Sequence, residues 1–398
     1  MFGCGLMKKA QVYSVVALLI AIPLFLFITY YLSSSCSGKG VAERIVADQI
    51  GHVAKSIEND FYRALDIATK RALLAMISYI VESGSGVDDS VARLRELMIN
   101  GTIFGNESYI MKNNTLTDWI KKINNKDINF NLNLSYSNLT FSIKYYTLTV
   151  SSKFLLNISS KLGNMYLARE KYIPVNVSLL GLEDPSFPLH TEGFVRRYIR
   201  SYPFPYTARV IVNGTSAKGS CSGNVTFNQT PDSSKILVTH NASNVSGFLG
   251  VIAETTDIPS VECYVIGAAN AVQEVNETVS RTGYWRIYVD NTTSMPNAVW
   301  HLPILTAIEN GYYISGHGPS YLMRMENNMN SSEEGIESFV NVPELELNKI
   351  EVKDYSRVDH LYFSNNNTIS YGVKGLPQWF KIDEYHASLY NLTILLDK

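Results

Sequence analysis

The sequence has few cysteines, few charged residues and no strong charge of either sign. Only four of the 398 residues are cysteine, which excludes the small secreted domains that depend on several disulfides. Charged residues make up 18% of the chain and the formal net charge is -2, so we expect no nucleic-acid partner. The hydrophobic fraction of 46% is ordinary for a globular protein and allows a buried core. The length indicates several packing units rather than one domain.

The signatures of common enzyme classes are also missing. The chain has no G-x-S-x-G, H-E-x-x-H, Walker or C-x-x-C motif. The best polar candidates are the turn Gly316–Pro319, which presents His317, and the segment Asp354–His360. In that segment Asp354, Asp359 and His360 could bind a metal if the fold gathers them, but their spacing does not require it. We therefore predict no catalytic residue, no metal site and no cofactor.

The chain has one long apolar run near its N-terminus. Val12–Leu32 contains 21 residues without a charge, about enough for a helix to cross a 30 Å hydrocarbon core. Lys8 and Lys9 precede the run, and basic residues stay on the cytoplasmic side. The sequence predicts a transmembrane helix over 11–33, residues 1–10 as a leader or cytoplasmic segment, and an extracellular ectodomain. The expected localisation is the cell membrane, with a single pass and a cytoplasmic N-terminus.

Asn-x-Ser/Thr sequons are abundant downstream of residue 99. The 32 Asn of that region would form roughly five or six sequons by chance, whereas the sequence has seventeen. Acceptor asparagines are modified only on the far side of a membrane, so the excess indicates an N-glycosylated exterior; an Asn-rich surface without sugar is the alternative. The sequons begin at Asn100, Asn106, Asn113, Asn133, Asn138, Asn157, Asn176, Asn213, Asn224, Asn228, Asn241, Asn244, Asn276, Asn291, Asn330, Asn366 and Asn391.

The segment Lys8-Lys9-Ala10-Gln11 resembles the processing site of archaeal type IV pilin-like precursors, which carry a class III signal peptide. In that family a short basic leader is removed just before the apolar helix, and the resemblance implies a cut between Ala10 and Gln11. Many members have Glu at the fifth mature position, where this chain has Val15. That departure bears on filament assembly more than on cleavage.

Beyond the apolar run, the patterning divides the chain into further segments. The sequence predicts a flexible linker over 34–40. It predicts a helical juxtamembrane region over 41–100, because apolar residues recur there every three or four positions. Residues 101–205 predict a β-rich part, because polar and apolar residues alternate over 129–149. Short strands between turns over 206–280 indicate an immunoglobulin-like β-sandwich, and 281–398 is mixed. The expected fold class is α+β with a mostly β ectodomain.

Two cysteines lie within the sequon-rich part. Cys221 and Cys263 could form a disulfide across 42 positions if that part sits in an oxidising space. Two buried thiols are the alternative.

We therefore expect a membrane-anchored, N-glycosylated surface protein of an archaeon, with a pilin-like, adhesive or envelope-associated structural role. Its expected partners are the membrane, N-linked glycans and pilin-like or envelope proteins. An anchored ectoenzyme that hydrolyses envelope sugars or peptides, or a ligand-binding ectodomain, is the alternative.

Overall fold

A computed structural model describes residues 4–126, 129–161, 165–203, 208–211, 216–221, 225–226, 235–254, 259–267, 287–290, 298–366 and 368–398. The chain divides into two compact units, each described by itself. The first contains residues 1–68, 113–140 and 150–175, and the second contains 69–112, 141–149 and 176–398.

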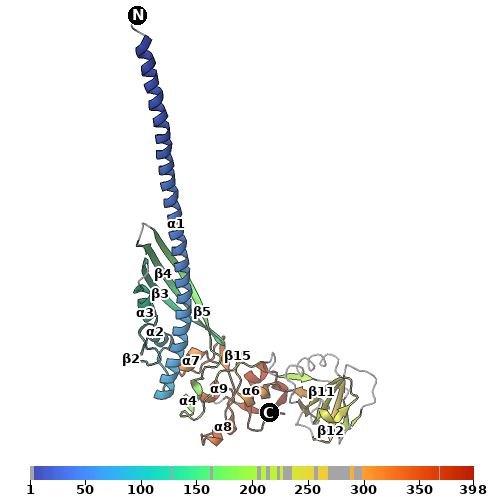
Figure 1. Cartoon of the computed structure of the whole chain (residues 1–398). Coiled ribbons are helices and arrows are strands. Elements are labelled where there is room, and N and C mark those ends of the chain that lie inside the picture. The colour runs from blue at the N-terminus through green and yellow to red at the C-terminus, as the bar shows by residue number, and fades with distance from the viewer. Residues whose placement is uncertain are drawn as a thin grey trace. The chain divides into compact units, whose positions relative to one another are not determined.

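A single helix, α1 (Cys4–Ser83), occupies the N-terminal part of the chain (Figure 1). It continues through 34–40, where the sequence predicted a flexible linker. The Ser and Gly residues there lower helix propensity by only about 0.5–1 kcal/mol each, which a long helix tolerates. The backbone of Lys8, Lys9, Ala10 and Gln11 is helical, but their side chains lie outside the described part.

The prediction of a transmembrane helix over 11–33 is wrong. In the part of the chain that the structure describes, no helix combines the length and the apolar content that a bilayer crossing needs. The expected single-pass membrane localisation is contradicted by the same finding.

In the first unit, one face of α1 packs against strands. The apolar stripe predicted from the sequence is the buried face, with Ile50, Ile57, Phe61 and Leu65 at most 6% exposed. The Phe61 ring lies 5.1 Å from the ring of Phe154. The neighbouring three-stranded sheet has the order β3-β4-β5, with bounds β3 (Phe130–Lys144), β4 (Thr147–Ser160) and β5 (Tyr166–Ser178).

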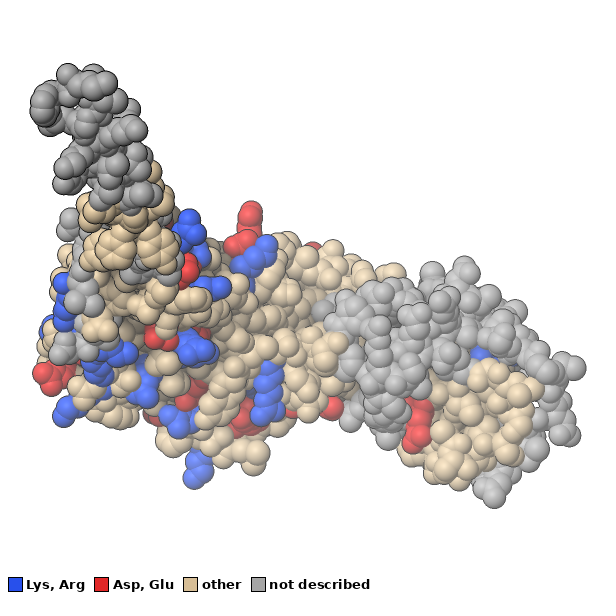
Figure 2. Space-filling model, turned by 45° about the horizontal axis from the view of Figure 1, so that its top comes forward, with Lys and Arg blue, Asp and Glu red and all other residues tan. Residues whose placement is uncertain are grey.

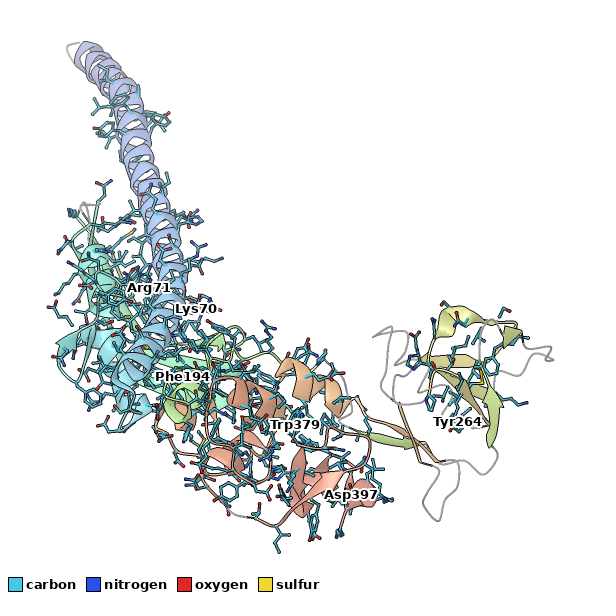
Figure 3. The ribbon with its side chains drawn as sticks, turned by 90° about the horizontal axis from the view of Figure 1, so that it is seen from below. Lys70, Arg71, Phe194, Tyr264, Trp379 and Asp397 are labelled. Carbon is cyan, nitrogen blue, oxygen red and sulfur yellow. A yellow bond between two sulfur atoms is a disulfide. The ribbon has the colours of Figure 1, made fainter. Side chains whose placement is uncertain are left out.

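The expected immunoglobulin-like sandwich over 206–280 is not formed by the described residues. The main sheet of this segment has the order β11-β9-β12-β7, and β11 pairs with β9 in parallel. Cys221 follows β7 directly and Cys263 lies on β12, and the two form a disulfide visible near Tyr264 in Figure 3. Because β12 pairs with β7, this disulfide joins neighbouring strands of one sheet, whereas the immunoglobulin disulfide joins two sheets. The strands are β7 (Ser216–Ser220), β9 (Lys235–Thr239), β11 (Val251–Glu254) and β12 (Glu262–Gly267).

The C-terminal part of the second unit is built from short elements around one apolar core. Leu302, Phe339, Phe380 and Ile382 belong to this core. The elements are α6 (Ile304–Asn310), β15 (Ile314–Gly316), α7 (Tyr321–Met325), β16 (Gly335–Glu337), α8 (Val342–Leu347), α9 (Asp359–Phe363), β17 (Ser370–Val373), β18 (Lys381–Asp383), α10 (Glu384–Leu389) and β19 (Leu396–Asp397).

The remaining elements are short and complete the mixed architecture. Helix makes up 39% of the described residues and strand 28%, so the prediction of an α+β protein with a mostly β ectodomain is wrong. The reason is the length of α1 and the small size of the sheets, none of which exceeds four strands among the described residues. These elements are α2 (Ser90–Asn100), β1 (Thr102–Ile103), β2 (Asn106–Glu107), α3 (Leu116–Asn124), α4 (Ser186–His190), β6 (Arg209–Ile211), β8 (Val225–Thr226), β10 (Val245–Ser246), β13 (Ile287–Asp290) and β14 (Ala298–His301).

Candidate metal centre

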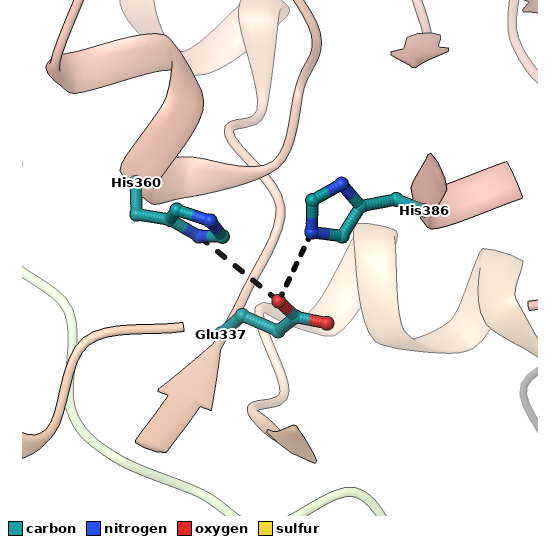
Figure 4. A group of neighbouring side chains, drawn as sticks. All are labelled: Glu337, His360 and His386. Carbon is teal, nitrogen blue, oxygen red and sulfur yellow. Dashed lines mark ion pairs between the residues drawn. The ribbon is translucent and has the colours of Figure 1, made fainter. Parts of the chain in front are cut away.

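Three buried side chains meet in the C-terminal core of the second unit. Glu337 ends β16, His360 lies in the first turn of α9, and His386 lies in the first turn of α10. Their potential ligand atoms all lie within 4.8 Å of one another. Figure 4 shows the Glu337 carboxylate between the two imidazole rings. The three side chains are 1%, 2% and 4% exposed, so water has little access to them.

The polar atoms at the centre of this cluster have no hydrogen-bond partner. Glu337 Oε2, His386 Nε2 and both ring nitrogens of His360 are buried and have no hydrogen-bond partner among the described residues. Leaving such atoms unpaired costs about 1–3 kcal/mol each. Glu337 Oε2 lies 3.5 Å from His386 Nε2 and 4.0 Å from His360 Nδ1, which is too far for a normal hydrogen bond. These distances leave room for an ion between the three groups.

The spacing fits a tetrahedral zinc site in part. Ligand atoms at about 2.0–2.1 Å from zinc lie about 3.4 Å from one another. The separation of Glu337 and His386, 3.5 Å, is close to this value. The separation of Glu337 and His360, 4.0 Å, would have to shorten by about half an ångström.

A second set of side chains holds the cluster in place. The N-cap residue of α10, Asp383, accepts the backbone N–H of His386 at 3.0 Å and contacts its ring Nδ1 at 2.8 Å. This leaves Nε2 to face Glu337. Tyr390 donates its hydroxyl to Glu337 Oε1, which leaves Oε2 to face the histidines. Carboxylates that orient a histidine ligand in this way are usual in metal sites.

Charged neighbours shift the pKa values of this pair. Burial by itself lowers the pKa of His386, but the hydrogen bond with Asp383 and the nearby charge of Glu337 outweigh burial and raise this pKa to about 9. Burial by itself raises the pKa of Asp383, but the contact with His386 lowers it to about 2. A proton on His386 Nε2 and a metal ion would therefore compete for the same lone pair.

A buried arginine adjoins the cluster. Arg324, which is fully buried, lies 2.8 Å from Asp184 and 3.0 Å from Asp359. Asp359 in turn accepts the backbone N–H of His360 at 2.6 Å and that of Ser338 at 3.0 Å. Burial by itself raises the pKa of Asp359, but the charge of Arg324 outweighs burial and keeps this pKa below its usual range. The ion pair with Arg324 thus holds Asp359, and Asp359 in turn holds Ser338. These two residues are next to His360 and Glu337 in the sequence.

The charges of this network do not balance. Four carboxylates of this network are buried, those of Asp184, Glu337, Asp359 and Asp383, and one guanidinium, that of Arg324, pairs with Asp184 and Asp359. With His386 protonated, as its raised pKa indicates, the network carries two negative charges in excess, and it would carry three once a metal ion displaced that proton. Excess negative charge in a dry interior is costly, and a divalent cation would reduce the excess to one.

Sequence reasoning identified only one of the three cluster residues. His360 belonged to the candidate segment Asp354–His360. Asp354 is instead exposed and pairs with Lys381 at 2.6 Å, and Asp359 forms an ion pair with Arg324. His317 is exposed, and its ring packs against that of Tyr385 at 6.1 Å.

Glu337 and His386 were missed, because 23 and 26 positions separate Glu337, His360 and His386, a spacing that matches no local metal motif. The sequence-based expectation was that the chain has no metal site.

The predicted glycosylation sites are largely accessible. Asn213, Asn224, Asn228, Asn276 and Asn291 lie outside the described residues. Of the other twelve sequon asparagines, Asn244 is half-buried and the remaining eleven are exposed.

No protein-family model matches the chain, and neither the comparison with curated proteins nor that with solved structures found a match. The candidate site therefore rests on its own geometry.

Proposed function

We propose that this protein binds one divalent transition-metal ion of the zinc class between Glu337, His360 and His386. The observation that carries the proposal is the convergence of three buried ligand atoms, one from each of these residues, within 4.8 Å of one another. Two imidazoles favour zinc, copper, iron or nickel over magnesium and calcium, which prefer oxygen ligands.

The ion would have a structural role. The three ligands come from β16, α9 and α10, which are distant in sequence, so one ion would crosslink three segments of the core. Their low exposure, at most 4%, favours a closed site over one that admits a substrate, since catalytic zinc keeps an open coordination position.

Calorimetric titration of the full chain, treated first with a chelator, tests this proposal. Zinc is expected to bind with a stoichiometry of one, and magnesium is not expected to bind. His360→Ala and His386→Ala should each weaken zinc binding by more than about 100-fold, since loss of an outer residue alone costs 10–100-fold. The matched control is His52→Ala, which removes an exposed histidine of α1. Equal zinc affinity in all four proteins would reject the site.

A second proposed function concerns the surface. We propose an N-glycosylated protein with a structural or adhesive role, matured by removal of a pilin-type leader before Gln11. The exposure of eleven of the twelve described sequon asparagines supports the glycosylation. Figure 2 shows acidic and basic side chains interspersed over the described part of one face, as expected for a surface that does not bind nucleic acid.

Peptide mass spectrometry of the protein from its native source tests both parts of this second proposal. Glycan masses on sequon peptides and a chain that starts at Gln11 are expected. Unmodified sequon peptides and a chain that starts at Met1 would reject it.

A further inference from the structure

A pocket in the second unit lies among side chains that the metal proposal does not use. Its volume is about 370 Å³, and it lies between residues 196–200, the C-terminal end of α6 and the helix α8. This size falls at the lower end of the range of small-molecule sites.

Two arginines and a tyrosine line one wall of the pocket. Residues 196–200 alternate in exposure, so that Arg196, Tyr198 and Arg200 face outward while Arg197 and Ile199 are buried. In an extended chain, outward residues two positions apart lie about 7 Å from each other. The wall therefore presents two guanidinium groups with one aromatic ring between them, and the guanidinium of Arg196 is paired with Glu183 at 2.8 Å.

The floor of the pocket contains a fixed guanidinium. Arg197 donates to the backbone oxygen of Phe339 at 2.6 Å and lies 3.2 Å from Glu344. Its guanidinium carbon lies 4.2 Å from the centre of the Phe187 ring. Gly311 has a φ of 63°, and a Cβ there would lie 3.1 Å from Arg197 Nε. A larger residue at position 311 would press on this floor, so the glycine keeps the end of the pocket open.

The lining combines one unpaired arginine with several hydrogen-bonding groups. Arg196 pairs with Glu183 at 2.8 Å and Arg197 with Glu344 at 3.2 Å, and Glu309 also lines the pocket. No described residue forms an ion pair with the exposed side chain of Arg200. Asn341 Oδ1 is buried without a hydrogen-bond partner, and Asn310 also lines the pocket. Neither asparagine begins a sequon, so no predicted glycan is attached to this lining.

We propose that this pocket binds a sugar unit that carries a carboxylate. The carboxylate would accept hydrogen bonds from Arg200, since a guanidinium group binds a carboxylate in a two-point contact. The sugar ring would pack on the Tyr198 face. Hydroxyl groups would pair with Asn341 and Glu309, which satisfies the unpaired amide oxygen.

Titration of the full chain with glucuronate, glucose and acetate, followed by NMR, tests this proposal. Glucuronate is expected to bind at least about tenfold more tightly than either of the others, because only glucuronate has both the charge and the ring. Arg200→Ala should weaken glucuronate binding about tenfold or more and leave glucose binding unchanged. The matched control is Arg63→Ala on α1, where the side chain is 77% exposed.

Three results would overturn the proposal. Acetate that binds as well as glucuronate would show an anion site without sugar recognition. Equal glucuronate affinity in Arg200→Ala and in the unaltered chain would place the ligand elsewhere. A Glu-rich peptide that binds more tightly than glucuronate would show a peptide-docking surface. Should Arg200→Ala unfold, Tyr198→Ala is the second variant, and unchanged glucuronate binding there would also reject the site.

Discussion

Zinc should raise the thermal stability of this protein through Glu337. An ion that binds only the folded state stabilises it by about 2.7 kcal/mol when its free concentration is 100 times its Kd. For a domain larger than about 150 residues, each 1 kcal/mol shifts the unfolding midpoint by about 2–4 °C. Zinc at that concentration should therefore raise the midpoint of the unaltered chain by about 5–10 °C relative to the chelated protein.

Glu337→Gln is the informative perturbation, because glutamine has nearly the same shape but no charge. Without zinc, the variant removes one of the two excess negative charges from the buried network, so it should be about as stable as the unaltered chain. With zinc it should lose most of the midpoint shift, because the amide is a poor ligand. The unfolding midpoints of Glu337→Gln and the unaltered chain should therefore differ clearly only when zinc is present.

Differential scanning calorimetry measures the unfolding midpoint of each protein, once with chelator and once with zinc. Glu334→Gln is the matched control, since Glu334 is 51% exposed and lies outside the cluster; it should keep the full shift. Equal zinc-induced shifts in the unaltered chain and in Glu337→Gln would refute the reasoning, as would the absence of a shift in the unaltered chain.

Three further predictions concern stability. Arg324→Met should lower the free energy of unfolding by about 3–5 kcal/mol, because it leaves two buried carboxylates without their cation; urea unfolding measures this loss, and a change below about 1 kcal/mol would contradict it. Replacing Cys221 and Cys263 by serine should cost about 4 kcal/mol for a 42-residue separation, with the reduced, unaltered chain as the control, and equal urea midpoints before and after reduction would refute it. The pKa of Glu58 is lowered from 4.5, first by its hydrogen bond with Lys171. This pair therefore stabilises the fold above about pH 4.5 and loses its effect as the pH falls. Glu58→Gln should be less stable at pH 7 and equal to the unaltered chain near pH 2, and a pH-independent difference would contradict this.

The sequence predicts the local elements well where periodicity is long and regular. Apolar residues of α1 recur every three or four positions from Ile50 to Ala72, and the structure buries most residues of this stripe, Ile57, Phe61 and Leu65 among them. The alternation over 129–149 corresponds to β3 and the start of β4. Both patterns follow from side-chain direction alone, which local sequence determines.

Strand pairing could not be predicted from the sequence. The spacing of short strands over 206–280 is compatible with several topologies, and the parallel pairing of β11 with β9 depends on contacts between residues far apart in the chain. The same limit applies to the metal centre. Glu337, His360 and His386 each look ordinary in their local sequence, and only the packing of β16, α9 and α10 brings them together.

The most direct test of the proposed metal centre is anomalous X-ray diffraction at the zinc edge from crystals of the protein grown with zinc. The account predicts one strong anomalous peak per chain, about 2.0–2.2 Å from Glu337 Oε2 and from one ring nitrogen each of His360 and His386. Crystals with no peak between these three side chains, or with zinc only on the surface, would contradict it.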